Sequence, residues 1–442
     1  MSSALEQHGE HGAPGPRVLP ASLAAPEVMV AWRTRALIVA AVFALLTLLF
    51  LGTHEGRNHI MRAYLMGYMT CFNFAGGALV MLMLQYVSGG KWGLLLRRPL
   101  EAMTRTLPLV ALMVVPILVP ALGKHLYQWV MYPDAASTNN AYAQGWINHE
   151  QALTANFKRP MLNPQALVGE TCIIFGVLLL FMFLLNRWSL ERDADPERGT
   201  EPSFERWRTR FENLSGPGIL IYVILMTLGA IVWIKSLDVT WYSSIWGLQF
   251  LVAQGYAVLA LGILSVILLS RYEPMKTLLR VTEQHDLGKL AFAFTMLNIY
   301  LCFAEFLIIW SGNIPDELPW YLARIHGGWW VVCSADFICH WLIPFCLLLS
   351  RDLKRNKNKM IWLTCWMIFA RLIDMFWLIE PSFKNAAGNL VGEPLSILAY
   401  VTVPMTMLAI WAAYYMTQLM ARPLVVVNDP HLEEMLEAEH AH

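Results

Sequence analysis

The sequence predicts an all-α polytopic membrane protein with about ten transmembrane helices. Of its 442 residues, 57% are hydrophobic and only 14% are charged, and the mean hydropathy is +0.47, a composition typical of membrane proteins. A helix that crosses a bilayer needs about 20 mostly apolar residues. Stretches of this kind lie at about residues 36–51, 64–87, 107–123, 167–187, 218–234, 243–270, 290–311, 325–350, 360–380 and 394–418.

The first stretch is the shortest, which raises the question of a cleaved signal peptide. It follows a polar and Pro-rich segment, and no small-residue cleavage site comes after it, so an uncleaved span is the better interpretation. We therefore divide the chain into an N-terminal tail (1–32), a ten-span membrane domain (33–418) and a C-terminal tail (419–442).

The distribution of positive charge predicts the orientation in the membrane. The net charge is zero, with 32 Lys and Arg residues. With the N-terminus in the cytoplasm, 23 of them fall on the cytoplasmic side and eight on the opposite side, and only Arg371 lies inside a span. Since cytoplasmic loops carry an excess of Lys and Arg, both termini are predicted to be cytoplasmic.

Two longer loops interrupt the membrane domain. The outer loop 124–166 is rich in aromatic side chains, which favours a packed cap or a protein contact over a solvated linker. These aromatic residues are Trp129, Tyr132, Tyr142 and Trp146. The cytoplasmic loop 188–217 interleaves acids and arginines, a pattern consistent with a short surface helix.

Motifs for redox cofactors are missing from this sequence. None of the seven cysteines belongs to a CxxC pair or a CxxCH haem-attachment site, the usual signatures of iron–sulfur and c-type haem ligation. Of twelve histidines, only His340 lies well inside a predicted span, so bis-histidine haem ligation has no second ligand. We expect no metal, haem or iron–sulfur centre held by this chain, and no nucleic-acid partner.

Ionisable residues lie deep inside three consecutive predicted spans. A lone charge in the bilayer costs a few kcal/mol or more, so such residues usually face a partner, a cavity or an ion path. The helical repeat places the ionisable residues of each span on one helix face, and on the seventh span Asn298 shares that face. We therefore expect three polar faces to meet inside the second half of the protein. The residues are Glu305, Asp336, His340, Arg371 and Asp374.

Two interpretations of this array are open. In the structural one, Arg371 neutralises Asp374 and another acid, and His340 hydrogen-bonds Asp336. In the functional one, a buried acid or histidine passes protons along a relay. Three acids face one arginine, so at least one acid is expected to be protonated at neutral pH, which favours the relay.

The relay has a predicted route across the membrane. Its inlet would lie where the seventh span meets the cytoplasm, and its outlet would pass Glu305 toward Glu380 or Asp316. In order, the residues are His285, Asp286, Lys289, Asn298, Asp336, His340, Arg371, Asp374, Glu305 and Glu380. Alternatively, the same cluster binds a quinone, with His340 or Asp336 contacting a carbonyl group.

The first half of the membrane domain has no charge at the middle of a span. It contains the pair Gly76 and Gly77 in the second span, which predicts a close helix contact. In the eighth span, Pro344 predicts a local distortion.

Several short motifs resemble the ActF subunits of bacterial alternative complex III. They are HDLGK at 285–289, Tyr300-Leu301, IIWSGNIPDE at 308–317, and a tail motif that runs from Pro423-Leu424 to VNDP at 427–430. ActF-type chains belong to the NrfD/PsrC-like integral membrane proteins. The resemblance therefore implies two four-helix bundles, spans 2–5 and spans 6–9, flanked by spans 1 and 10.

The resemblance implies a subunit of an oxidoreductase in the bacterial inner membrane. This enzyme would pass electrons from quinol to an acceptor of the cytochrome c type. The implied partners are an ActC-like paralogue, an iron–sulfur subunit and a multihaem cytochrome c subunit, which would carry the redox centres. The family is often described as quinone-binding, although the quinol site is generally assigned to the paralogue. The role implied for an ActF-type chain is proton conduction or support. Where relatives often have a Ser-Gln pair, this chain has Ala304-Glu305, which adds a titratable group.

Two further functions remain open at this stage. One is a quinone-binding anchor of another NrfD-type reductase, which would share the fold and differ in its partners. The other is a stand-alone ion-coupled secondary transporter, in which midplane charges bind substrate and ion. Transporter sites are often built on broken helices, whereas spans 7 and 9 have no internal Gly or Pro, so this interpretation is weaker.

Overall fold

The computed structural model describes residues 18–49, 54–315, 317–383 and 397–436. Within these ranges the protein is helical, and ten helices are long and apolar enough to cross a membrane. This confirms the predicted polytopic helical fold. The ten spans are Val28–Leu48, His59–Ser88, Trp92–Leu118, Pro164–Asp193, Glu201–Leu237, Trp246–Leu269, Val281–Gly312, Trp329–Leu349, Lys357–Ser382 and Ala399–Met420.

Most spans are single helices, whereas the third and eighth are segmented. The long helices are α1 (Val28–Leu48), α2 (His54–Ser88), α10 (Pro164–Asp193), α11 (Glu201–Trp233), α12 (Trp246–Leu269), α14 (Val281–Gly312), α19 (Lys357–Ile379) and α20 (Ala399–Met420). The third span consists of α3 (Trp92–Thr104), α4 (Leu107–Met113) and α5 (Val115–Leu118). The eighth consists of α16 (Trp329–Asp336), the π-helical turn η2 (Phe337–Leu342) and α17 (Ile343–Leu349).

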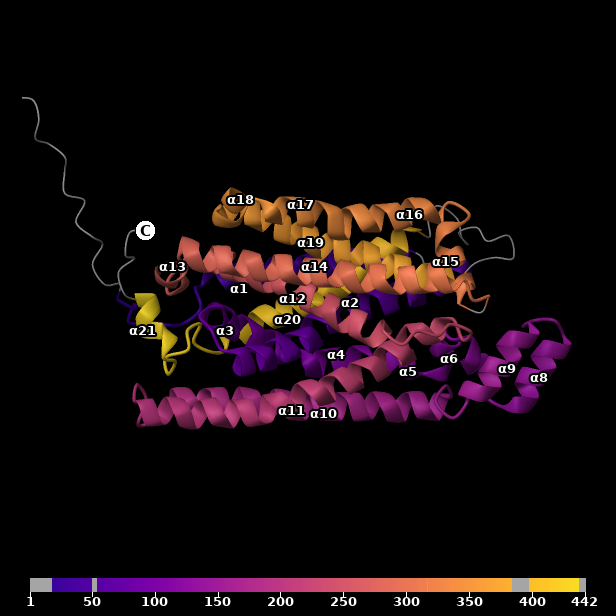
Figure 1. The fold of residues 1–442 in the computed structure, drawn as a ribbon, viewed down its shortest axis with the longest axis horizontal. Coiled ribbons are helices and arrows are strands. Elements are labelled where there is room, and N and C mark those ends of the chain that lie inside the picture. Colours follow the sequence, from indigo (N-terminus) through magenta and orange to yellow (C-terminus); the bar gives the residue numbers. More distant parts are fainter. Residues whose placement is uncertain (1–17, 50–53, 316, 384–396, 437–442) are drawn as a thin grey trace, which may run out of the picture.

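Short helices connect the spans at both ends of the molecule. They are α6 (Pro120–Gly123), α7 (Gln128–Met131), α8 (Ala135–Ala143), α9 (His149–Lys158), η1 (Lys235–Leu237), α13 (Met275–Leu278), α15 (Leu318–Ile325), α18 (Arg351–Arg355), η3 (Glu380–Ser382) and α21 (His431–Leu436). Figure 1 shows α13, α18 and α21 at one end and α8, α9 and α15 at the other. Leu424 N–H donates to the carbonyl oxygen of Leu23 (2.8 Å), so both tails meet at the end that carries α21.

The spans form two four-helix bundles that share a central contact. One bundle packs α2, α3–α4, α10 and α11 together, and the other packs α12, α14, α16–α17 and α19. Helices α2 and α12 contact each other between the bundles, while α20 packs along α2 and α1 packs along α20. In Figure 1, α10 and α11 lie along one edge of the molecule and α16 to α18 along the opposite edge.

The two central helices approach closely because α2 carries glycine at the contact. A Cβ atom added at Gly77 would lie 2.8 Å from Val258 Cγ2 and 3.1 Å from the carbonyl oxygen of Gln254. Both partners belong to α12, so the close contact predicted from Gly76 and Gly77 is confirmed. The apolar window of α2 is 100% buried within the protein, which makes this helix the core of the fold.

Several predicted span boundaries were wrong. Helix α10 continues to Asp193 and α11 begins at Glu201, so the acids and arginines expected in loop 188–217 lie mainly on helical extensions of two spans. The third span begins at Trp92, well before the predicted start at residue 107. Hydropathy underestimates these helices because ion pairs within the protein neutralise their charged ends.

Those ion pairs form a buried network that the sequence did not reveal. Arg98 Nη1 lies 2.6 Å from Glu101 Oε2, and Arg98 also pairs with Asp193. Arg97 Nη1 lies 2.6 Å from Asp429 Oδ2, which fastens the C-terminal tail to α3. Although burial opposes ionisation, Arg97 and Arg192 hold the pKa of the Asp429 carboxyl below its usual range. The contribution of this group to stability is therefore present at neutral pH and is lost as the pH falls through its lowered pKa.

Loop 124–166, which is predicted to lie on the outer side, contains short helices, in partial agreement with the expected cap. Trp129 is buried and packs against Tyr127, with ring centroids 5.0 Å apart. Trp146 is 67% exposed, so the helices at the tip present an aromatic residue to the outside. Lys158 at the end of α9 donates to the carbonyl oxygens of Val239 (2.5 Å) and Trp241 (3.3 Å), which ties the cap to the loop after α11.

The glycine contact gives a stability prediction. Gly77→Ala forces a methyl group against the backbone of α12, and overpacking of this kind costs about 1–3 kcal/mol. We expect a lower Tm for the detergent-solubilised protein. Gly176→Ala is the matched control, because an added Cβ there meets nothing within 4 Å. Equal melting temperatures for the two variants would contradict a tight α2–α12 contact.

Candidate functional site

The predicted polar faces of the second bundle meet at a cavity of about 730 Å³. Its wall is formed by α12, α14, α15, α16–η2 and α19. The residues of the predicted array that line it are Asn298, Glu305, Asp336, His340, Arg371 and Asp374, and Cys302 and Cys333 line it beside them. The prediction that these three faces converge is therefore confirmed.

Asp336, His340 and Asp374 form the centre of this array. Each of the three offers one atom that could bind a metal ion, a carboxylate oxygen or an imidazole nitrogen, and these three atoms lie within 4.8 Å of one another. Arg371 Nη1 donates to Asp374 Oδ2, as the spacing of three residues on α19 allows. These residues lie near the middle of the spans Trp329–Leu349 and Lys357–Ser382, where charge is most expensive to bury.

Several polar atoms of the cluster have no hydrogen-bond partner among the described residues. They are Asp336 Oδ1, His340 Nε2, Arg371 Nε and Arg371 Nη2, all buried. A buried donor or acceptor left unpaired costs about 1–3 kcal/mol. A polar cavity of this size has room for water molecules or a polar headgroup that would pair with such atoms.

The eighth span widens into a π-helical turn at the cluster. The α-helical donor to the carbonyl oxygen of His340 would be the N–H of residue 344, and Pro344 has none. Instead, Tyr256 Oη donates to this carbonyl oxygen (3.1 Å), and Trp366 Nε1 donates to the carbonyl oxygen of Cys339 (3.0 Å). The distortion predicted from Pro344 is thus confirmed. Turns of this type occur frequently at functional sites.

Glu305 lies at the wall of the cavity and is held by three side chains. Gln249 Nε2 donates to Oε2 (2.9 Å), Tyr321 Oη donates to Oε2 (3.2 Å), and Ser243 Oγ donates to Oε1. Glu305 is only 5% exposed. The sequence did not identify these partners, since they come from α12, α15 and the loop before α12 and carry no motif.

Within the described part of the chain, no side-chain hydrogen bond joins the predicted inlet residues to the cavity. Lys289 Nζ pairs with Asp286 Oδ1 (2.9 Å), and both side chains are more than half exposed. His285 is half-buried beside them near the start of α14. Asn298 follows Lys289 by nine residues, a rise of about 14 Å along a helix, and the Thr295 hydroxyl between them donates to its own helix at Ala291. A proton would need water to cross this stretch.

Glu380 belongs to a different cluster, and it is not among the residues that line the polar cavity. Arg62 Nη1 donates to Glu380 Oε1 (3.0 Å), and Tyr400 Oη donates to Oε2. His59 Nδ1 lies 2.9 Å from Tyr400 Oη. Six residues after Asp374, the helical repeat turns a side chain about 240° away, which explains why Glu380 leaves the cavity face. Asp316, the other predicted outlet, lies outside the described residues.

The cluster can hold and exchange protons, and its donor set also resembles that of a cation site. Two carboxylates and an imidazole are suitable metal ligands. However, the Arg371 guanidinium is already paired with Asp374, so a cation would have to compete with a fixed positive charge. Three acids against one arginine leave the cavity with excess carboxylate, which suits binding and release of protons.

Comparison with known proteins adds no assignment to this geometry. No protein-family model and no curated protein matches the chain.

Proposed function

We propose that this chain is an integral membrane subunit of a quinol:electron-acceptor oxidoreductase of the alternative complex III type, in which it conducts protons beside a quinol-oxidising paralogue. The observation that carries the proposal is the cluster of Asp336, His340 and Asp374 within 4.8 Å, placed with Arg371 in one cavity. The array contains three acids and one arginine, an excess of acids that favours proton exchange over a purely structural contact between helices.

A proton path requires groups that gain and lose protons inside the membrane. Asp336 and His340 each have a buried polar atom without a hydrogen-bond partner among the described residues. These atoms can therefore exchange protons with water in the cavity. The Arg371 guanidinium forms an ion pair with Asp374, while Asp336 and His340 face the same cavity. Together these residues can cycle between protonated and deprotonated states.

The partners follow from the motifs that resemble ActF-type chains. Iron–sulfur and multihaem cytochrome c subunits would carry the electrons, and this chain would supply the proton path and part of the membrane scaffold. The excess of Lys and Arg on the side of the termini favours a cytoplasmic position for both tails. The end that bears α8, α9 and α15 (Figure 1) would then face outward from the inner membrane.

Removing the charge of the central acids tests the proton path. In the purified complex reconstituted into vesicles, Asp336→Asn and Asp374→Asn should reduce quinol-driven proton translocation by about tenfold or more, because an amide cannot bind and release a proton. A pH-sensitive dye outside or inside the vesicles reports translocation, and acceptor reduction reports electron transfer.

Glu191→Gln provides the control for these variants. Glu191 lies on α10 and pairs with Arg187 at 2.7 Å on the surface of the first bundle. The Glu191→Gln variant should translocate protons as the unmodified chain does. Unchanged translocation in Asp336→Asn and Asp374→Asn would refute the proposed path.

Purification tests the assignment to a complex. We expect the chain, extracted from native membranes in mild detergent, to elute together with subunits that stain for covalent haem and contain iron and acid-labile sulfur. Mass spectrometry should identify a paralogue of similar size. Elution as a lone chain, with transport activity in vesicles, would instead support a secondary transporter.

A second candidate function is favoured by the lateral edge of the cavity. Exposed apolar side chains surround it between α14 and α16–η2, as a membrane-soluble tail would require. They include Phe303, Phe306, Phe337, Ile338 and Leu342. A photoreactive quinone analogue should then label α14 or η2 in the complex, and labelling only in the paralogue would exclude quinone binding here.

A further inference from the structure

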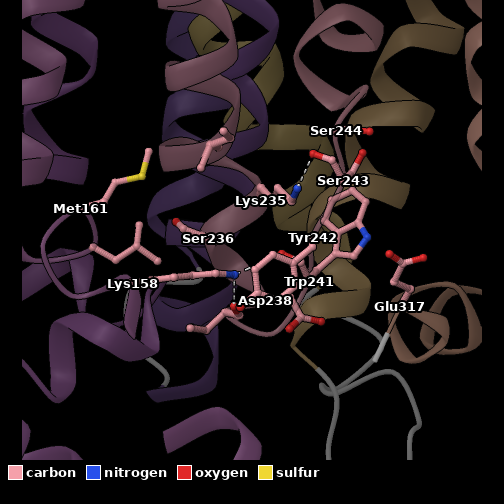
Figure 2. Close-up of a pocket in the computed structure, with 13 residues that line it drawn as sticks. Lys158, Met161, Lys235, Ser236, Asp238, Trp241, Tyr242, Ser243, Ser244 and Glu317 are labelled. Carbon is pink, nitrogen blue, oxygen red and sulfur yellow. Dashed lines mark hydrogen bonds between the residues drawn. The ribbon is translucent and has the colours of Figure 1, made fainter. Parts of the chain in front are cut away.

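A second cavity, which we call the vestibule, lies beside the first toward the outer end of the protein. Its volume is about 530 Å³. Figure 2 shows its side chains, which come from the end of α9, from η1 and from the loop that leads into α12. The polar residues that line it are Lys158, Lys235, Ser236, Asp238, Tyr242, Ser243, Ser244 and Glu317.

An aromatic wall separates the vestibule from the polar cavity. Trp241 lines the vestibule and Trp320 lines the cavity. Their rings stack with centroids 3.9 Å apart and planes 9° from parallel. Trp246, which also lines the cavity, packs edge-on against Trp241 at 4.9 Å. Such a wall gives a proton no hydrogen-bonded route through it.

One hydrogen bond passes from one cavity to the other. Ser243 lines the vestibule, and its hydroxyl donates to Oε1 of Glu305, which lines the polar cavity. Lys235 Nζ donates to the backbone carbonyl oxygen of Ser243 (2.9 Å), a contact visible in Figure 2. The loop that carries Ser243 is therefore anchored at the wall.

We propose that Glu305 and Ser243 form the proton outlet of the polar cavity, which delivers protons into the vestibule. The inference rests on the proposed proton-conducting function and gives it an outer exit. Protonated Glu305 transfers its proton to Ser243 Oγ, while the original hydroxyl proton of Ser243 passes to a water molecule in the vestibule. One proton leaves, and only O–H bonds form and break. The transfer leaves the Ser243 hydroxyl donating to the Glu305 carboxylate, the arrangement that the structure shows. After Glu305 is protonated again from the polar cavity, rotation of the hydroxyl toward the vestibule prepares the pair for the next transfer.

The groups around this pair suit an outlet. On the cavity side, Gln249 and Tyr321 donate to Oε2 of Glu305, which leaves Oε1 to Ser243. The charged groups on the vestibule side are two amines and two acids, so the vestibule carries little net charge. They are Lys158, Lys235, Asp238 and Glu317.

Lys158 lies at the outer side of the vestibule and supports proton release there. Its ammonium group lies 3.8 Å from the centroid of the Tyr242 ring. Burial lowers the pKa of the Lys158 amine to about 8, against the opposing effect of Asp238. An amine with this pKa exchanges protons with water at a pH close to neutral.

The test compares four variants in the reconstituted complex. Ser243→Ala should reduce proton translocation several-fold, because no hydroxyl then connects the cavities. Ser243→Thr should restore it, since the hydroxyl returns. Ser244→Ala is the control: Ser244 lies next in the chain and makes no hydrogen bond to Glu305 within the described residues, so it should behave as the unmodified chain. Glu305→Gln keeps hydrogen-bonding capacity and should lose translocation as Ser243→Ala does.

Two results separate this inference from the proposed function. Full translocation in Ser243→Ala, together with its loss in Asp336→Asn, would overturn the outlet and leave the proton-conducting function in place. Full translocation in both variants would overturn the function itself. The Tm of each variant is measured in parallel; if Ser243→Ala does not fold, the result with Glu305→Gln decides, and full translocation in that variant overturns the outlet.

Discussion

The cost of burying charge away from water is the constraint on which this structure depends. An isolated charge at the centre of a membrane helix costs about 3 kcal/mol or more, so polar side chains within spans must find partners inside the protein. At the end of the first bundle that contacts the C-terminal tail they do so in the ion pairs of Arg97 and Arg98. In the second bundle the same requirement brings Asp336, His340, Arg371 and Asp374 to one cavity.

The two bundles meet this constraint differently. Around Arg98, each acid has a nearby guanidinium, and the network fastens helices and the tail together. In the second bundle, atoms of Asp336, His340 and Arg371 remain without described protein partners, and the acids outnumber the single arginine. The first arrangement suits a static scaffold, whereas the second suits a site that exchanges protons.

The arrangement of the cavities gives the site a direction. The polar cavity ends at a wall of stacked tryptophans, Trp241 and Trp320, and the vestibule lies beyond that wall. Only side chains that reach around the wall can connect the two spaces, and Glu305 and Ser243 do so. Where ActF-type chains often have Gln, this chain has Glu305, so the proposed outlet depends on a titratable group at that position.

The sequence by itself determined the number of spans, the polar faces of α14, α16–η2 and α19, and the close contact at Gly77, because hydropathy and the 3.6-residue repeat are local properties. Only the tertiary structure decided which polar groups meet. In the folded protein, Glu380 pairs with Arg62 and does not face the cavity. Ser243 and Gln249 donate hydrogen bonds to Glu305. These contacts join residues far apart in the chain, and their distances depend on how whole helices pack, which no local pattern encodes.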